Sequence, residues 1–208
     1  MGSLIGTTIT IAVLTLSSLM MGATITSVID AESDSITTEN NIEKLTSDAI
    51  AEISTYIQIR DQKGKFSKIN GVQKIEKIAI LISPLVSQNI DISRLTIQIS
   101  NGRILKILRN NGIIEHLDSY SIFEHSIWDK LDGNNFGFIS ISDYDRSLIS
   151  NKLLNDFSDN VYIVIRLPAG MAMKTYDKIA IDLFPATGMA TTIILEAPFS
   201  MSQIITFE

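Results

Sequence analysis

Cysteine is absent from the 208 residues of this chain. Disulfide bonds, thiolate metal sites and cysteine nucleophiles are therefore excluded.

Only two histidines occur, His116 and His125, each preceded by a glutamate. Such pairs suit a metal site, but surface histidines are the simpler interpretation. Neither a nucleophile elbow nor a phosphate-binding glycine loop is present, so we do not expect an enzyme. Asn-x-Ser/Thr is missing as well, so we expect no N-glycans.

Charge is missing from the first part of the chain, where the first ionisable side chain is Asp30. Residues 30–57 contain seven acidic residues and one lysine, so this segment carries the net charge of −6 that the whole chain has. From residue 58 onward, sixteen acidic and sixteen basic residues cancel. A neutral remainder lacks the basic surface that nucleic acids require, so nucleic-acid binding is not expected.

The uncharged residues 1–29 combine apolar side chains with many small and hydroxylated ones. As a helix rising about 1.5 Å per residue, this segment would be roughly 40 Å long, enough to cross a bilayer core of about 30 Å. Glycine, serine and threonine allow helices to pack closely. We therefore expect copies of this helix to pack against one another in a bundle. The apolar residues predicted to lie there are Leu4, Ile5, Ile9, Ile11, Val13, Leu14, Leu16, Leu19, Met20, Ile25 and Val28.

The start of the chain allows two explanations. Neither lysine nor arginine precedes the apolar stretch, which argues against an intact secretory signal peptide. The segment is then either a native membrane anchor with an uncharged start or a mature N-terminus from which a short charged leader has been removed. We favour the second explanation.

The helix is predicted to continue into the acidic segment. Apolar residues recur every three or four positions between residues 42 and 57, which is typical of an amphipathic helix. Proline does not occur before Pro84, and the first strong stop signal is Gly64. We therefore predict one helix over residues 1–60, divided into a membrane or filament-core part (1–29) and an acidic part (30–60), and a head domain over 61–208.

Short runs rich in β-branched residues follow from residue 72 at intervals of about 8 to 15 residues; one of them is SIFEHSIW, residues 121–128. The pairs Asn101-Gly102 and Asn111-Gly112 have the composition of hairpin turns. About eight antiparallel strands are expected, with a short helix within residues 145–160. The sequence thus predicts an α+β protein in which a long N-terminal hydrophobic helix carries an all-β immunoglobulin-like sandwich.

A calcium site is one interpretation of the segment DGNNFGFISISD. Asp132, Asn134 and Asp143 occupy the first, third and twelfth positions of a calcium-binding loop, and Asp145 is a further candidate ligand. Phe136 stands at the fifth position and cannot bind a metal. A polar hairpin turn is therefore the other interpretation. We expect no cofactor besides calcium.

Six basic residues follow the acidic segment. They are Arg60, Lys63, Lys65, Lys68, Lys74 and Lys77. One hypothesis is that they face the acidic segment of a neighbouring copy of the chain. The alternative is that they simply lie in solvent, because exposed ion pairs contribute little individually.

Both ends of the chain resemble a known family. The start IGTTITIAVLTL and the closing stretch IDLFPATGMATTIILEAPFSMSQIITFE, with Pro185, Gly188 and Pro198, are similar to the archaellins, the archaeal flagellins of the type IV pilin-like superfamily. Position 5 is isoleucine, where many bacterial pilins have glutamate. The middle of the chain carries no such resemblance.

The resemblance implies a structural subunit that polymerises with itself into an extracellular helical filament, the archaellum, for motility. It implies helices in the filament core and β heads outside. It further implies insertion into the membrane before assembly, removal of a leader by a prepilin-type peptidase, and dependence on the archaellum or pilus assembly machinery. Two alternatives remain: a static adhesive type IV-like pilus subunit, and a minor membrane-anchored β-sandwich surface protein.

Overall fold

The computed structural model describes residues 44–45, 56–69, 71–87, 89–118, 121–186, 189–199 and 202–207. The chain divides into two compact units, residues 1–49 and 50–208. In the first unit only Lys44 and Leu45 are described, both helical and exposed. The eleven residues from Leu4 to Val28 that were expected in a filament core therefore lie outside the described residues. All the strands belong to the second unit, called the head below.

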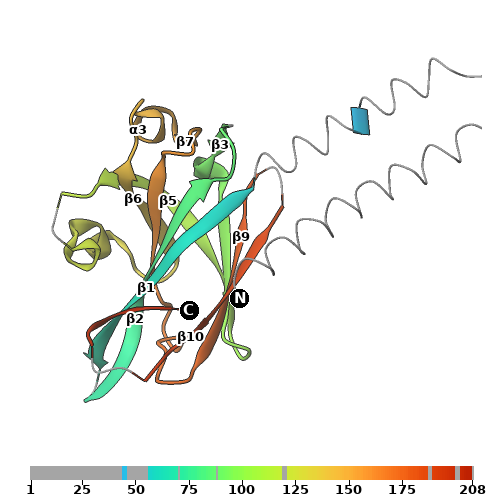
Figure 1. Cartoon of the computed structure of the whole chain (residues 1–208). Coiled ribbons are helices and arrows are strands. Elements are labelled where there is room, and N and C mark those ends of the chain that lie inside the picture. The colour runs from blue at the N-terminus through green and yellow to red at the C-terminus, as the bar shows by residue number, and fades with distance from the viewer. Residues whose placement is uncertain are drawn as a thin grey trace, which may run out of the picture. The chain divides into compact units, whose positions relative to one another are not determined.

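Nine strands of the described head form one sheet, and two short strands pair separately (Figure 1). The strands are β1 (Ile57–Ile69), β2 (Val72–Pro84), β3 (Ile90–Asp91), β4 (Thr96–Ser100), β5 (Leu105–His116), β6 (Asn135–Ser142), β7 (Leu153–Leu154), β8 (Asn160–Arg166), β9 (Lys178–Phe184), β10 (Thr191–Glu196) and β11 (Ile204–Thr206). The order in the sheet is β10-β9-β4-β5-β6-β8-β2-β1-β11. The helical elements are η1 (Ile92–Arg94), η2 (Ile122–Glu124), η3 (Ser126–Lys130) and α3 (Ser147–Asn151).

The predicted fold class is wrong. The described residues are mostly strand, with a single curled sheet in place of two stacked sheets and without a long N-terminal helix. One strand pair, β5 with β6, is parallel, whereas an antiparallel sandwich was expected. Alternation of apolar and polar residues shows that a strand has one buried face, but a curled sheet and a sandwich produce the same alternation. Among the described residues, no helix is both long and apolar enough to cross a membrane.

The predicted boundary between helix and head is also wrong. Residues 57–60, assigned to the end of the helix, begin strand β1, which pairs with β2 from Ile57 opposite Pro84 to Ile69 opposite Val72. Gly64, predicted to stop the helix, lies inside β1. A Cβ atom there would be 3.0 Å from the ring of Phe207, so glycine lets the last strand pack closely. Two register shifts along β1 obscure its alternation, and this is why the sequence pattern did not indicate a strand.

The main core lies on one face of the curled sheet and takes residues from every strand of the described head. Phe136 and Phe138 of β6 meet edge to face inside it, with ring centroids 5.5 Å apart. Residues 136–140 of β6 and 161–165 of β8 are buried in unbroken runs. Unbroken burial means that both faces of these two central strands are covered.

Residues 121–131 cover the face of β6 and β8 that lies opposite the main core. Phe123 and Trp128 stack with their ring centroids 5.8 Å apart and pack on Ile139 and Val164. The predicted strand at residues 121–128 is therefore wrong, since this stretch forms η2 and η3. The Trp128 indole donates to the Ile122 carbonyl over 2.8 Å, a side-chain bond that holds the turns and that the β-like composition did not reveal.

The turn predictions have mixed outcomes. The Asn101-Gly102 hairpin is confirmed between β4 and β5, where the Asn101 side chain accepts the amide hydrogens of two following residues and Gly102 has φ +80°. The Asn111-Gly112 turn is wrong, because these residues lie within β5 at a register shift. The short helix within residues 145–160 is confirmed as α3.

Candidate functional site

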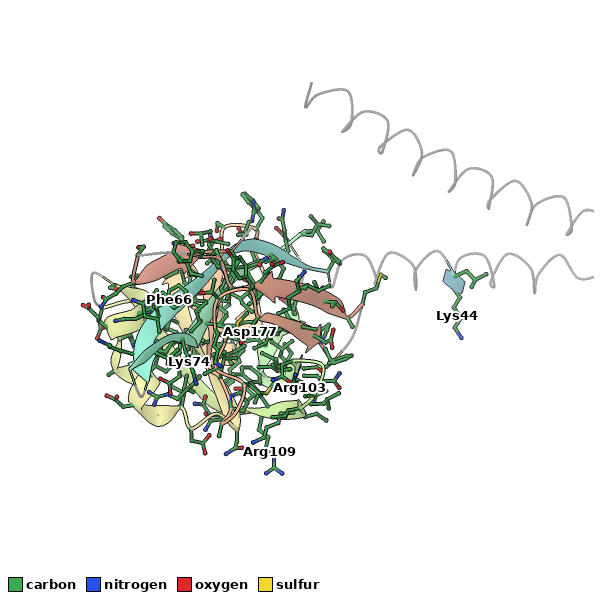
Figure 2. All side chains as sticks on the ribbon, turned by 90° about the horizontal axis from the view of Figure 1, so that it is seen from below. Lys44, Phe66, Lys74, Arg103, Arg109 and Asp177 are labelled. Atoms are coloured by element: carbon green, nitrogen blue, oxygen red, sulfur yellow. The ribbon has the colours of Figure 1, made fainter. Side chains whose placement is uncertain are left out.

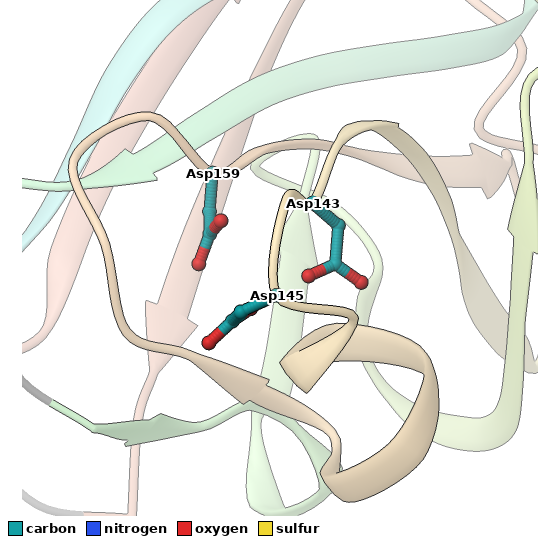
Figure 3. A group of neighbouring side chains, drawn as sticks. All are labelled: Asp143, Asp145 and Asp159. Carbon is teal, nitrogen blue, oxygen red and sulfur yellow. The ribbon is translucent and has the colours of Figure 1, made fainter.

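Three aspartates meet at one end of the sheet, and Figure 3 shows their side chains next to one another. Asp143 follows strand β6, Asp145 precedes α3, and Asp159 immediately precedes β8. One carboxylate oxygen from each lies within 4.8 Å of the other two. We call this group the aspartate cluster. Neighbouring strands β6 and β8 place it, because the end of one adjoins the start of the other.

Asp159 is the buried member of the aspartate cluster, with only 1% of its surface exposed. Its Oδ2 accepts the backbone N–H groups of Asn155 and Asp156, each over 3.0 Å. Its Oδ1 is buried and has no hydrogen-bond partner among the described residues, and the same holds for Oδ1 of Asp143. Burial raises the pKa of Asp159, and the nearby Asp143 and Asp145 raise it further. Two buried oxygens without donors are costly unless a cation supplies the missing charge.

Asp145 is the exposed member of the aspartate cluster. The Asn155 side-chain amide donates to its Oδ2 over 2.8 Å, and the Ser147 backbone N–H donates to its Oδ1 over 3.0 Å. These hydrogen bonds lower the pKa of Asp145 to about 2, so it is ionised at neutral pH. Carboxylate oxygens are the ligands that Ca²⁺ and Mg²⁺ prefer. The aspartate cluster is therefore the arrangement in the described head that best suits a divalent cation.

The structure does not bring together all the residues of the predicted calcium loop. Asp132 and Asn134 precede strand β6 and Asp143 follows it, and a strand of 8 residues separates its ends by roughly 26 Å. The Asp132 carboxylate instead accepts the Asn134 N–H over 2.9 Å, which closes a turn and contributes to lowering the pKa of Asp132. Asp143 does meet Asp145. Their third partner, Asp159, was missed because it comes from a separate loop and belongs to no sequence motif.

A cation-binding test follows from this geometry. We expect millimolar Ca²⁺ to raise the melting temperature: a ligand at 100 times its dissociation constant stabilises a protein by about 2.7 kcal/mol. Asp159→Asn removes one buried negative charge, so it should stabilise the metal-free protein and abolish the response to Ca²⁺. The control is Asp129→Asn, which removes an exposed carboxylate from another part of the head. Thermal unfolding with Ca²⁺ or with a chelator provides the measurement; identical curves for the unaltered chain would rule the site out.

The two histidines do not form a metal site with their glutamates. His125 is buried; its Nδ1 accepts the Ile127 N–H over 3.1 Å, and its Nε2 lies 2.9 Å from the His116 carbonyl oxygen. Nε2 is also 3.1 Å from the Asp118 carboxylate. His125 thus fixes the turns of residues 121–131 through both ring nitrogens. The interpretation as a surface histidine is wrong for this residue.

A polar groove with a cavity volume of about 810 Å³ lies at the other end of the head, where β8 ends. Lys74 of β2, Arg103 of the β4–β5 loop and Asp177 before β9 line it and are labelled in Figure 2. Lys174, which also precedes β9, lines it as well. Its lining includes neither histidine nor serine. Glu76 and Lys178 also line the groove, which is therefore a surface with charges of both signs.

The six basic residues after the acidic segment are divided between β1 and β2. Two of them have partners inside the head: Arg60 donates to the Ser83 hydroxyl over 2.8 Å, and the Lys63 ammonium lies 2.9 Å from Asp61. A third, Lys77, lies over the ring of Trp128, with its ammonium 4.9 Å from the ring centroid. The six therefore do not behave as one uniform solvated flank.

Comparison with known proteins shows which solved structures have a similar fold. Family models and curated proteins gave no match. Among solved structures, archaeal flagellin FlaB1 from Methanocaldococcus jannaschii has a TM-score of 0.64 at 22% identity, over 73% of this chain and 95% of that one. The archaeal flagellum of Methanospirillum hungatei strain JF1 has a TM-score of 0.51 at 12% identity, over 94% of this chain and 95% of that one. This chain therefore has a fold like those of two archaeal flagellins.

Proposed function

We propose that this chain is a structural subunit that polymerises with itself into an extracellular archaeal filament, the archaellum. The observation that carries the proposal is the shared fold along 95% of the M. jannaschii flagellin and 95% of the M. hungatei filament subunit. The match to the filament subunit covers 94% of this chain.

The two parts of the chain have different roles in this proposal. Residues 1–29 carry no charge, and their apolar side chains from Leu4 to Val28 make the contacts between copies inside the filament. Residues 57–208 form the outer surface, supported by the compact head and its own core. An uncharged stretch of this length is unfavourable in water, so burial among copies is the state that removes it from solvent.

The same uncharged segment supports a route to the filament. Before assembly it would reside in the membrane, where apolar side chains are favourable and hydroxyl and glycine residues allow close packing. A prepilin-type peptidase would remove a charged leader, and the archaellum machinery would then add the subunit to the filament. The mature subunit lies at the cell surface and has no catalytic role.

A swimming assay tests the archaellum against a static adhesive pilus, which needs the same kind of subunit. Deleting the gene should abolish swimming in soft agar, and the intact gene on a plasmid should restore it. Retained swimming together with lost surface attachment would instead favour the pilus. A minor surface protein would leave both swimming and the filaments unchanged.

A further inference from the structure

Three cationic side chains stand in one row across the sheet. Lys65 of β1 lies opposite Lys77 of β2, and Lys77 lies opposite Arg166 of β8. Adjacent strands are about 4.8 Å apart, so the three residues fall within roughly 10 Å. Like charges placed directly opposite one another destabilise a sheet. We call these residues the cationic row. A nearby anion would offset the repulsion among its three charges.

The described residues of the head supply no carboxylate in direct contact with the cationic row. Among the described residues, none of the three cations lies within 4.0 Å of a carboxylate, the limit that the salt bridges of this head meet. Lys63, two residues before Lys65, is by contrast paired with Asp61 at 2.9 Å. The shortage of carboxylates is therefore local to the row.

The cationic row is also partly dehydrated. The Lys77 ammonium lies over the Trp128 ring, and the Arg166 guanidinium donates to the Trp128 carbonyl oxygen over 2.8 Å. Nε of Arg166 is buried and has no partner among the described residues. Burial lowers the pKa of Lys77, and so do the charges of Arg166 and Lys65, with only partial compensation from Asp129 and Glu76. A carboxylate reaching this row would meet charges that water screens less than on an open surface.

The matching negative charge is concentrated elsewhere in the same sequence. Residues 30–52 contain seven carboxylates, two to five positions apart, against one lysine. Several of them can therefore approach a row of roughly 10 Å together. Charge-assisted hydrogen bonds between a carboxylate and a guanidinium are about twice as strong as neutral ones.

We propose that the cationic row is the docking surface for the acidic segment, residues 30–52, of a second copy of this chain. The inference rests on the proposed function, since it requires copies to meet. A contact between two different surfaces of identical copies repeats from copy to copy, and it generates an open helical filament when the rotation between copies does not close a ring. The cationic row would thereby fix how each head joins its neighbour.

The test uses the full-length chain and compares two charge reversals. Lys65→Glu alters the cationic row, and the control Lys68→Glu makes the same change of charge at an exposed position of β1 outside the row. At low salt we expect Lys65→Glu to raise the critical concentration for polymerisation by roughly tenfold, an effect of the size that one desolvated charge contact produces, and Lys68→Glu to leave it unchanged. High salt should shrink the difference, because it screens the contact.

A second comparison identifies the acidic segment as the partner. Replacing its seven carboxylates by amides should make polymerisation insensitive to Lys65→Glu, since two changes to one contact are not additive. Trp128, the only tryptophan in the chain, lies beneath Lys77 and reports on the row by its fluorescence. Its emission should shift when the unaltered chain polymerises and not when the amide variant does.

The outcomes separate the inference from the proposed function. If the unaltered chain forms no filaments, the proposed function fails. If it forms filaments but Lys65→Glu and Lys68→Glu have equal critical concentrations, only the docking surface is refuted. A full effect of Lys65→Glu in the amide background would also refute it, because the partner would then be another surface.

Discussion

Deleting residues 2–29 abolishes polymerisation and leaves a folded, soluble head; this is the first result we expect. The deleted segment contains no ionisable side chain and supplies the proposed contacts between copies. The core residues described for the head lie between residues 57 and 207, and we expect them to keep their packing without the deleted part. Analytical ultracentrifugation gives the size, and circular dichroism gives the melting temperature of the β structure.

A milder variant distinguishes the loss of apolar contacts between copies from the loss of the N-terminal segment itself. Replacing Ile9 and Val13 by lysine keeps the segment intact but places two charges among its apolar residues, and burying an unpaired charge costs several kcal/mol. We expect this variant to remain monomeric, whereas Thr10→Ser should polymerise normally. Filaments formed by the truncated chain would show that the heads alone hold the copies together. A truncated chain that remains fully functional at the cell surface would support the anchored surface protein instead.

The second large effect is on folding. Phe138 is fully buried in the main core and meets Phe136 edge to face. Phe138→Ala should lower the free energy of unfolding by roughly 3 to 5 kcal/mol, since it removes buried apolar area and leaves a cavity. Total stabilities of proteins are about 5 to 15 kcal/mol, so a loss of this size removes a large fraction.

The control for this effect is Phe157→Ala, because Phe157 is 65% exposed and lies outside both cores. Its replacement should change the free energy of unfolding by less than about 0.5 kcal/mol. Denaturant unfolding of the two variants, followed by the fluorescence of Trp128, provides the comparison. Equal losses for both variants would mean that the packing around β6 is not as described.

Local patterns predicted most of the strands but not their arrangement. The runs that became β2, β4, β5, β6, β8, β9, β10 and β11 were recognised by β-branched composition and by alternation. Pairing between strands distant in sequence leaves no such local signal. The parallel pair β5–β6 and the single curled sheet therefore did not follow from the sequence, and a sandwich was predicted instead.

Two local errors have specific physical causes. The register shifts of β1 interrupt its period of two, so residues 57–60 were assigned to a helix that they do not form. In residues 121–128 the apolar and aromatic side chains cover a sheet without joining it. His125 accepts the Ile127 N–H and Trp128 donates to the Ile122 carbonyl, and these two hydrogen bonds fix the turns. Composition alone does not distinguish a strand from a segment of turns that packs its apolar side chains on a sheet.

The aspartate cluster was only partly accessible to sequence reasoning. Asp143 and Asp145 are neighbours in the chain and were both considered as calcium ligands. The calcium-loop pattern, however, also pointed to Asp132 and Asn134, which an entire strand separates from them. Asp159 joins the cluster only because β6 and β8 are adjacent in the sheet, and that adjacency is a property of the fold.

Electron microscopy of material sheared from cells that express this chain tests the central claim most directly, with mass spectrometry to identify the protein present. The proposed function predicts uniform helical filaments composed of this chain, with residues 1–29 of many copies gathered along the axis and the β heads outside. The opposite result is sheared material without this chain, accompanied by monomers that only detergent releases from the membrane. That result would contradict a filament subunit and favour an anchored surface protein.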